Sequence, residues 1–230
     1  MSMKAKILIL FLNLFVINNL LLAQKTLRFD DTKLSYERAE SLFEHKNFSS
    51  AQKEFEEIIN LEAFSKNQKI EAQYYVGICA LRLNQPEVYS VEKLVDFSII
   101  NPNHPKSQYA IYEVANFYFH KKKFKEVTEY YNKISLSDFE DDLRNQGRFQ
   151  LAYAYFEQKE YDLAENNFDR VKNHDNKYKH AANYYSGYIK LKKKKYEEAL
   201  SDFKIAEGSA SYASAVPVMI SNIYYNLEQF

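Results

Sequence analysis

From about Thr32 onward the chain repeats itself every 34 to 38 residues. The repeat is clearest in the small residue at the middle of each apolar stretch: Ala39, Gly77, Ala115, Ala152, Gly187 and Ser221. The intervals between successive members are 38, 38, 37, 35 and 34 residues. A fixed period of about 20 to 50 residues is typical of repeat architectures, in which one unit buries its apolar face only against the next. The sequence therefore predicts a stack of similar units.

Each unit has the pattern of two antiparallel helices. In most copies an aromatic residue follows the small residue by nine positions: Phe48, Phe124, Tyr161, Tyr196 and Phe230. Three positions later comes Ala51, Val127, Ala164 or Ala199, and four beyond that Phe55, Tyr131, Phe168 or Phe203. The second copy has Pro86 and Tyr89 at the first two of these places, so we expect it to match in its first helix only. This spacing puts the apolar residues on one helix face. The chain has only 4 glycines and 4 prolines, and so few turn-forming residues favour helices over a fold with many β-turns.

The pattern predicts the bounds of the helices to within a few residues. The expected first helices of the units cover 33–46, 68–84, 106–121, 142–158, 178–193 and 213–228. The expected second helices cover 49–62, 87–100, 124–135, 161–173 and 196–206. The sixth copy therefore reaches the end of the sequence without a second helix.

Two segments carry a resemblance to a known family. Leu151–Val171 and Ser186–Ala206 resemble the tetratricopeptide repeat (TPR) in their small–aromatic–Ala–Phe spacing. The resemblance implies an all-α, right-handed superhelical solenoid over 32–230, with five helix pairs plus the first helix of a sixth. The longer early intervals resemble the repeats of periplasmic envelope-assembly proteins of the BamD and YbgF kind.

The N-terminal segment has the order of a secretory signal peptide. Lys4 and Lys6 precede an apolar run over Ile7–Ala23, and Ala23 provides a small residue before the expected cleavage point. We expect a signal peptide over 1–23 and a linker over 24–31, hence an exported, periplasmic or cell-envelope associated protein. The alternative is an uncleaved membrane anchor, for which the run is at the short limit of a membrane span.

Charge and cysteine content narrow the function classes. Lys and Arg number 31 and Asp and Glu also 31, so the sequence shows no basic excess for nucleic acid. The run Lys192–Lys195 lies where a first helix ends, and we interpret it as a solvated turn rather than a binding site for a polyanion. Cys79 is the only cysteine, so an internal disulfide is excluded, and its apolar neighbours predict a buried side chain.

We find no pattern that indicates catalysis. The histidines fall in predicted turns, with no two at metal-ligand spacing on one helix face: His45, His104, His120, His174 and His180. A phosphate-binding glycine loop and a nucleophile elbow are both absent from the sequence. We therefore expect a non-enzymatic chain without catalytic residues, metal or cofactor.

The resemblance also implies a binding surface. In TPR solenoids the first helices line a concave groove that takes an extended peptide or a partner's helix. One groove position, three residues before the small residue, is aromatic in five copies: Tyr36, Tyr74, Tyr112, Phe149 and Tyr184. The next position adds three candidate partner-binding residues: Asn116, Tyr153 and Tyr188. Tyrosine suits recognition because it offers large contact area at low entropic cost, although the same aromatics could instead pack between helices.

These observations leave three functions open. The first is a scaffold that binds a protein or peptide partner in the groove, without nucleic acid or metal, and meets the membrane only through the N-terminal segment or an envelope complex. The second is the sensor half of a longer signalling protein with an output domain beyond Phe230. The third is a module that binds cell-wall glycan. The uncovered sixth first helix indicates either a longer protein or a docking face.

Overall fold

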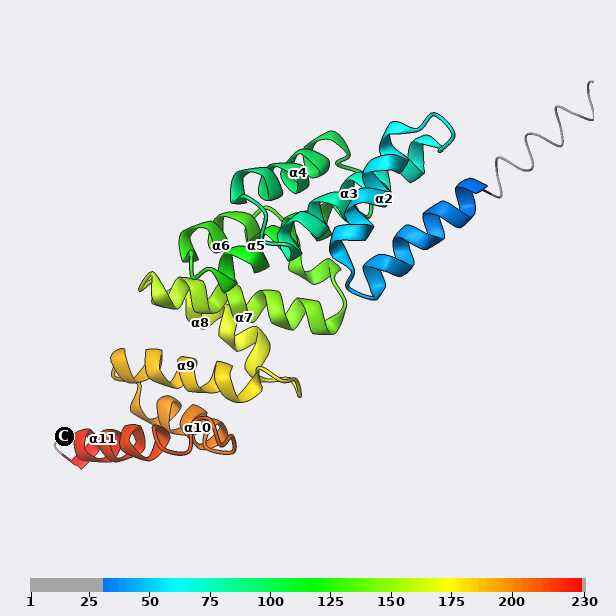
Figure 1. Ribbon diagram of the computed structural model, residues 1–230. Helices are drawn as coiled ribbons and strands as arrows, with labels where there is room; N and C mark the ends of the chain where they lie inside the picture. The colour runs from blue at the N-terminus through cyan, green and yellow to red at the C-terminus, as the bar shows by residue number, and fades with distance from the viewer. Residues whose placement is uncertain (1–30, 229–230) are drawn as a thin grey trace, which may run out of the picture. The chain divides into compact units, whose positions relative to one another are not determined.

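A computed structural model describes residues 31–228 of the chain (Figure 1). The helices follow one another as 31–44, α2 (Phe48–Asn60), α3 (Lys66–Arg82), α4 (Glu87–Ile100), α5 (Lys106–His120), α6 (Phe124–Tyr131), the short 3₁₀ helix η1 (Leu136–Asp138), α7 (Asp141–Glu157), α8 (Tyr161–Lys172), α9 (Lys179–Lys192), α10 (Tyr196–Ala206) and α11 (Val216–Glu228). No strand occurs within these residues. The expected signal peptide (1–23) lies outside the described residues, as does all of the expected linker except residue 31, which is helical.

The chain divides into two compact units, Met1–Lys106 and Ser107–Phe230. In the N-terminal unit the helix 31–44 pairs with α2, and α3 pairs with α4. In the C-terminal unit the pairs are α5 with α6, α7 with α8 and α9 with α10, followed by α11. Each unit is thus a series of helix hairpins in chain order. The predicted all-α, helix-turn-helix repeat fold is confirmed.

In each repeat that has two helices, the two helices touch at the small residue. Ala39, Ala115 and Ala152 are fully buried. A Cβ added at Gly187 would lie 3.2 Å from the Phe203 ring and 3.3 Å from the Ala199 carbonyl oxygen. A larger side chain at this position would push α10 away from α9, which explains why the repeat keeps a small residue there.

The second helix of the second copy keeps the spacing of the other copies, once one added residue in its turn is taken into account. Asn84 occupies the left-handed turn position, seven residues after Gly77, as in the other copies. The next helix then starts one residue late, because Gln85 is inserted before Pro86. Ser90 and Leu94, both fully buried, take the places of the alanine and the aromatic. The expectation that only the first helix of this copy matches was therefore wrong.

The hairpin turns share one backbone device. Among the described residues, five non-glycine residues have a positive φ, and each stands seven positions after the small residue: Lys46, Asn84, Lys122, Lys159 and Lys194. At each of them two backbone N–H groups return to carbonyls of the preceding helix, for example Lys159 N–H to Phe156 O at 2.9 Å and Glu160 N–H to Tyr155 O at 2.9 Å. This is the Schellman arrangement, which satisfies the last carbonyls of a helix. The lysine-rich turns are thus helix caps.

The left-handed turn residues predict a stabilising substitution. Lys159 has φ 64° and an exposed side chain, and a left-handed conformation costs a residue with a Cβ more than it costs glycine. We expect Lys159→Gly to raise the free energy of unfolding by about 0.5–1 kcal/mol, measured as a higher midpoint in urea denaturation followed by circular dichroism. The matched control is Lys125→Gly inside α6, which should lower stability by about 1 kcal/mol. A lower midpoint for Lys159→Gly would contradict the turn assignment.

Two helix bounds differ from the prediction. The helix expected over 124–135 ends at Tyr131, and the chain continues through η1 to α7. The helix expected from 213 begins at Val216, after turns over 208–215. The side chains of Val216 and Ile223 are fully buried against α10, whereas Ser221, at the small-residue position of the sixth copy, is exposed. Cys79 is fully buried, as predicted.

Candidate partner-binding surface

The aromatic ladder predicted to line a groove packs first of all within its own repeats. Each member contacts the buried ring of the second helix in the same repeat, with centroid distances of 5.4 to 6.1 Å: Tyr36 with Phe55, Tyr74 with Phe97, Tyr112 with Tyr131, Phe149 with Phe168, and Tyr184 with Phe203. The pairs are edge-to-face or tilted, the arrangement that ring quadrupoles favour. The ladder is therefore part of the hairpin core.

In the C-terminal unit a second aromatic covers several ladder rings from the following connection. Tyr178 stacks on Phe149 at 4.8 Å, and Tyr212 stacks on Tyr184 at 4.5 Å. Phe139 covers Tyr112 at 5.1 Å. The Phe149 and Tyr184 side chains remain half-buried.

Two predicted partner contacts in this unit are buried. Tyr112 is 2% exposed, and its hydroxyl donates to the Leu143 carbonyl oxygen at 2.9 Å. Asn116 is 9% exposed, and its Oδ1 accepts hydrogen bonds from Gln146 and Gln150 at 3.1 and 2.9 Å. Both side chains join α5 to α7, and neither presents a surface to a partner. The prediction that they contact a partner is corrected to an internal packing role.

The predicted residues of the N-terminal unit are half-buried. The Tyr36 hydroxyl donates to Glu71 Oε2 at 2.9 Å and so connects the helix 31–44 to α3. Burial raises the pKa of Tyr36, and the Glu71 carboxylate raises it further. The ring of Tyr74 lies 5.5 Å from Lys106 Nζ, within the range of a cation–π contact.

A second group of rings in the C-terminal unit is partly exposed. We call it the aromatic cluster; it comprises Phe119, Phe124, Tyr153, Phe156 and Tyr188. Tyr153 lies at its centre, 5.8 Å from Phe119, 5.6 Å from Phe124 and 6.3 Å from Phe156. Phe156 reaches Tyr188 at 5.5 Å. The cluster thus takes rings from α5, α6, α7 and α9, and it brings together Tyr153 and Tyr188 of the predicted set.

A hollow of about 410 Å³ opens on this cluster. Three of its lining residues are aromatic, Phe119, Phe124 and Tyr153, and three are polar, His120, Lys122 and Glu157. Burial raises the pKa of Tyr153, and the neighbouring Glu157 carboxylate raises it further, so the phenol stays protonated and can donate a hydrogen bond at neutral pH. Apolar walls with a few polar groups at the rim are typical of ligand and peptide sites.

The sequence contained a signal for the added members of this cluster. Phe119 and Phe156 both stand four residues after the small residue of their copy, on the same helix face as the predicted positions. For Phe124 the sequence predicts only the role of a repeat aromatic. What the sequence could not show is that these rings stay partly exposed while Tyr112 does not.

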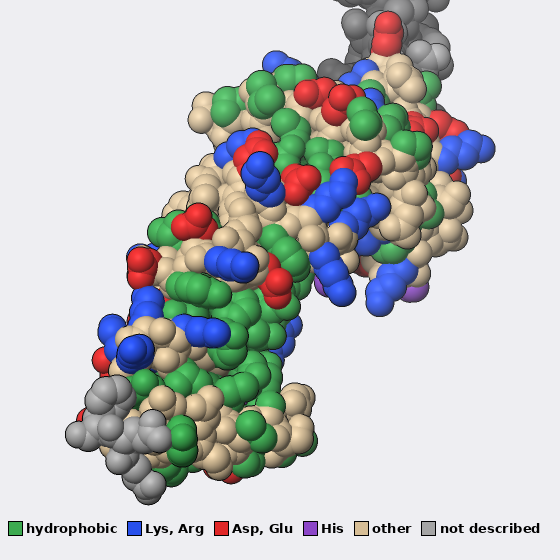
Figure 2. Space-filling view, turned by 90° about the vertical axis from the view of Figure 1, so that its left-hand side faces the viewer, with side chains coloured by type: hydrophobic (Ala, Val, Ile, Leu, Met, Phe, Trp, Pro, Cys, Tyr) green, Lys and Arg blue, Asp and Glu red, His purple; other side chains and the backbone are tan. Residues whose placement is uncertain are grey.

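The basic run at the end of α9 is largely a helix terminus. Lys192 ends α9, and Lys194 is the left-handed cap. Lys193 makes two ion pairs to α8, with Asp162 and Glu165, each at 2.6 Å. On the face shown in Figure 2, basic and acidic side chains are interspersed, with hydrophobic patches between them. That pattern differs from the continuous basic surface of nucleic-acid binders.

Within residues 31–228, no group of three or more His, Cys, Asp or Glu side chains is placed to hold a metal ion. In the same part of the chain, no helix has both the length and the apolar character needed to cross a membrane.

Solved structures of repeat proteins resemble this chain. MamA from AMB-1 matches with a TM-score of 0.61 at 16% identity, over 79% of this chain and 96% of that chain. MamA from RS-1 matches with a TM-score of 0.60 at 16% identity, over 76% and 92%. A kinesin light chain with nearly identical TPR-like repeats from Podosopora anserina matches with a TM-score of 0.54 at 14% identity, over 80% and 96%. These likenesses show a TPR-like fold.

No protein-family model matches the sequence, and no curated protein matches it either.

Proposed function

We propose that this chain is a non-catalytic protein-interaction scaffold that binds a partner peptide or helix on the aromatic cluster of its C-terminal unit. The observation that carries the proposal is a set of partly exposed rings from neighbouring hairpins, three of which, from α5, α6 and α7, line a hollow of about 410 Å³. The TPR-like fold supports it, because repeat solenoids present extended surfaces to other proteins.

The chemistry of the cluster selects an apolar segment with a polar neighbour. Phe119 and Tyr153 offer apolar ring faces, and the polar groups beside them are His120, Lys122 and Glu157. Rings already held by edge-to-face contacts lose little conformational freedom on binding, which favours affinity. A leucine- or phenylalanine-bearing helix face or strand of a partner would fill such a hollow.

The place of action that we propose is the cell envelope, in the periplasm or in a complex assembled at the outer membrane. This part of the proposal rests on the N-terminal sequence alone, with Lys4 and Lys6 before an apolar run that ends at Ala23. A fusion of 1–30 to a reporter that is active only after export tests it directly.

Removing the central ring tests the binding surface. We expect Tyr153→Ala to reduce recovery of a cross-linked partner from the source cell's envelope fraction by about tenfold or more, as for an interaction hot spot. The readout is mass spectrometry after pull-down with the full chain, and circular dichroism checks that each variant is folded.

The matched control is Tyr89→Ala, which removes a ring that is 37% exposed on the second helix α4 of the other unit. Its recovery of the same partner should equal that of the unchanged chain. Equal recovery with Tyr153→Ala, Phe156→Ala and Tyr188→Ala combined would refute the aromatic cluster as the binding surface.

A further inference from the structure

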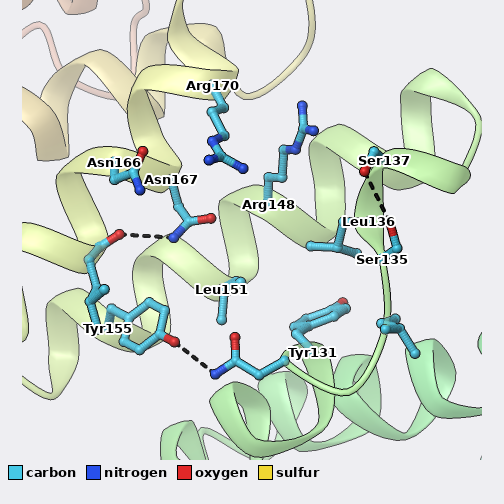
Figure 3. Close-up of a pocket in the computed structure, with 13 residues that line it drawn as sticks. Tyr131, Ser135, Leu136, Ser137, Arg148, Leu151, Tyr155, Asn166, Asn167 and Arg170 are labelled. Carbon is cyan, nitrogen blue, oxygen red and sulfur yellow. Dashed lines mark hydrogen bonds between the residues drawn. The ribbon is translucent and has the colours of Figure 1, made fainter.

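A second hollow, of about 370 Å³, lies on another face of the C-terminal unit (Figure 3). The connection between α6 and α7 forms one side, and α7 and α8 form the others. The polar side chains that line it include Ser135, Ser137, Arg148, Tyr155, Asn167 and Arg170. None of the thirteen residues drawn around it in Figure 3 is acidic.

The two arginines of this hollow have no anionic partner among the described residues. Arg144, one turn earlier on α7, shows the contrast, because it pairs with Asp141 and donates to the Phe139 carbonyl oxygen at 3.3 Å. Arg148 makes no such pair, and Figure 3 shows its guanidinium beside that of Arg170. Burial lowers the pKa of Arg148, and the charges of Arg144 and Arg170 lower it further. An anion placed between the two guanidiniums would relieve this repulsion.

The rest of the lining can donate hydrogen bonds or pack against an apolar group. The Ser135 and Ser137 hydroxyls lie 3.0 Å apart. The Tyr155 hydroxyl accepts a hydrogen bond from Asn132 at 2.8 Å, which leaves its own proton free to be donated. Leu136 and Leu151 supply apolar wall. The guanidinium and hydroxyl groups can donate hydrogen bonds to a carboxylate, and the leucines can pack against an apolar side chain next to it.

We infer that this hollow, the arginine pocket, binds an acidic segment of a protein partner through its carboxylates. The small size of the basic patch argues for this ligand over nucleic acid, since two arginines cannot follow a phosphate backbone.

The arginine pocket is distinct from the aromatic cluster. On α7 the pocket uses Arg148, Leu151 and Tyr155, whereas the ladder and cluster use Phe149, Tyr153 and Phe156. At about 100° per residue, the centres of the two sets lie about 130° apart around the helix. The chain can therefore hold one partner at each site, or two segments of one partner.

The test is a titration of the full chain with a short fluorescein-labelled peptide in which paired Glu residues are flanked by Leu. The matched probe replaces each Glu by Gln, and inorganic phosphate serves as a third probe. Fluorescence anisotropy gives the affinities, and NMR of the arginine Nε–Hε groups reports which side chains are contacted. We expect the Glu peptide to bind and to shift the Arg148 and Arg170 signals, and the Gln peptide to bind at least tenfold more weakly, about the loss for charge-assisted hydrogen bonds.

Variants locate the site. Arg170→Gln removes an exposed guanidinium with little risk to folding, and Arg148→Gln removes the half-buried one. Each should weaken the Glu peptide by about tenfold. Lys204→Gln on α10, the same charge change at an exposed position, should leave the affinity unchanged.

Three results would overturn the inference. These are an equal loss with Lys204→Gln, equal binding of the Gln peptide, and arginine shifts with phosphate but none with the Glu peptide. Tyr153→Ala should leave the affinity for the Glu peptide unchanged, so a failure here and a failure of the aromatic cluster are told apart.

Discussion

Replacing Asp202 by Ala should lower the free energy of unfolding of the C-terminal unit by about 3–5 kcal/mol. Asp202 is 5% exposed and lies between two buried lysines, Lys172 and Lys190, each 8% exposed. Its carboxylate is 3.1 Å from Lys172 Nζ and 2.8 Å from Lys190 Nζ. Removing this carboxylate leaves the two buried ammonium groups with much less negative charge near them. A buried charge that has lost its partner lowers the stability of the fold.

The neighbouring acids do not replace Asp202. Asp169 lies 2.8 Å from Lys172 Nζ, but its side chain is 45% exposed, and Glu198, 3.7 Å from Lys190 Nζ, is 56% exposed. Water screens the Glu198 pair, which weakens it. The Asp169 Oδ1 atom is buried, but it pairs with Lys172 and so leaves Lys190 with the screened Glu198 alone. Burial lowers the pKa of Lys172, but the hydrogen bonds with Asp169 and Asp202 outweigh it and the pKa is raised. Because the pKa of Lys172 is higher in the folded than in the unfolded chain, its protonation stabilises the fold fully at any pH below the unfolded-state pKa. This stabilisation is lost only as the pH rises through the folded-state pKa, so the network is intact at neutral pH.

Urea denaturation followed by circular dichroism measures the effect. Glu198→Ala is the matched control, because it removes an acid from the same helix and the same lysine, and it should cost less than about 1 kcal/mol. Replacing Asp202, Lys172 and Lys190 together by Leu, Met and Met should recover most of the loss, since no charge is then left alone in the core. A loss for Asp202→Ala no greater than for Glu198→Ala would show that the network does not stabilise the unit.

Tyr112→Ala should lower the free energy of unfolding by about 3–5 kcal/mol, the usual cost of removing a large buried ring. The ring packs against Tyr131 at 5.4 Å and Phe139 at 5.1 Å, and its hydroxyl reaches the Leu143 carbonyl oxygen. It therefore joins α5, α6 and the start of α7 in one contact. Hydrogen exchange of amides in α5 and α7 should show the weakening locally.

Two variants separate packing from recognition at this position. Tyr112→Phe keeps the ring and loses only the hydroxyl, so we expect a cost of about 1 kcal/mol. Tyr153→Ala removes a more exposed ring of the neighbouring helix and should cost clearly less than Tyr112→Ala. If Tyr112→Ala left stability unchanged and weakened partner capture instead, the sequence-based assignment of Tyr112 as a binding residue would be restored.

The sequence by itself determined the repeat and its hairpins. The small residues Ala39, Ala115 and Ala152 and the aromatics Phe55, Phe168 and Phe203 all lie in the core, as their spacing predicted. Such patterns can be read from a single chain because helix amphipathicity is local, with residues three or four apart sharing a face. The expected signal peptide over 1–23 and the cell-envelope location stay predictions of the sequence.

Only the tertiary structure decided which aromatics are accessible. Tyr112 and Tyr153 stand at neighbouring positions of the same repeat pattern. Phe139, from the connection after α6, covers Tyr112, whereas Tyr178, from the next connection, lies on Phe149, and within residues 31–228 no ring of that connection covers Tyr153. The same is true of the arginine pocket, whose lining comes from the end of α6, from the connection between α6 and α7 and from α7 and α8, and which leaves no sequence motif. Exposure and convergence depend on how irregular connections and neighbouring hairpins pack, and that packing joins residues about thirty positions apart, beyond the reach of a helical period.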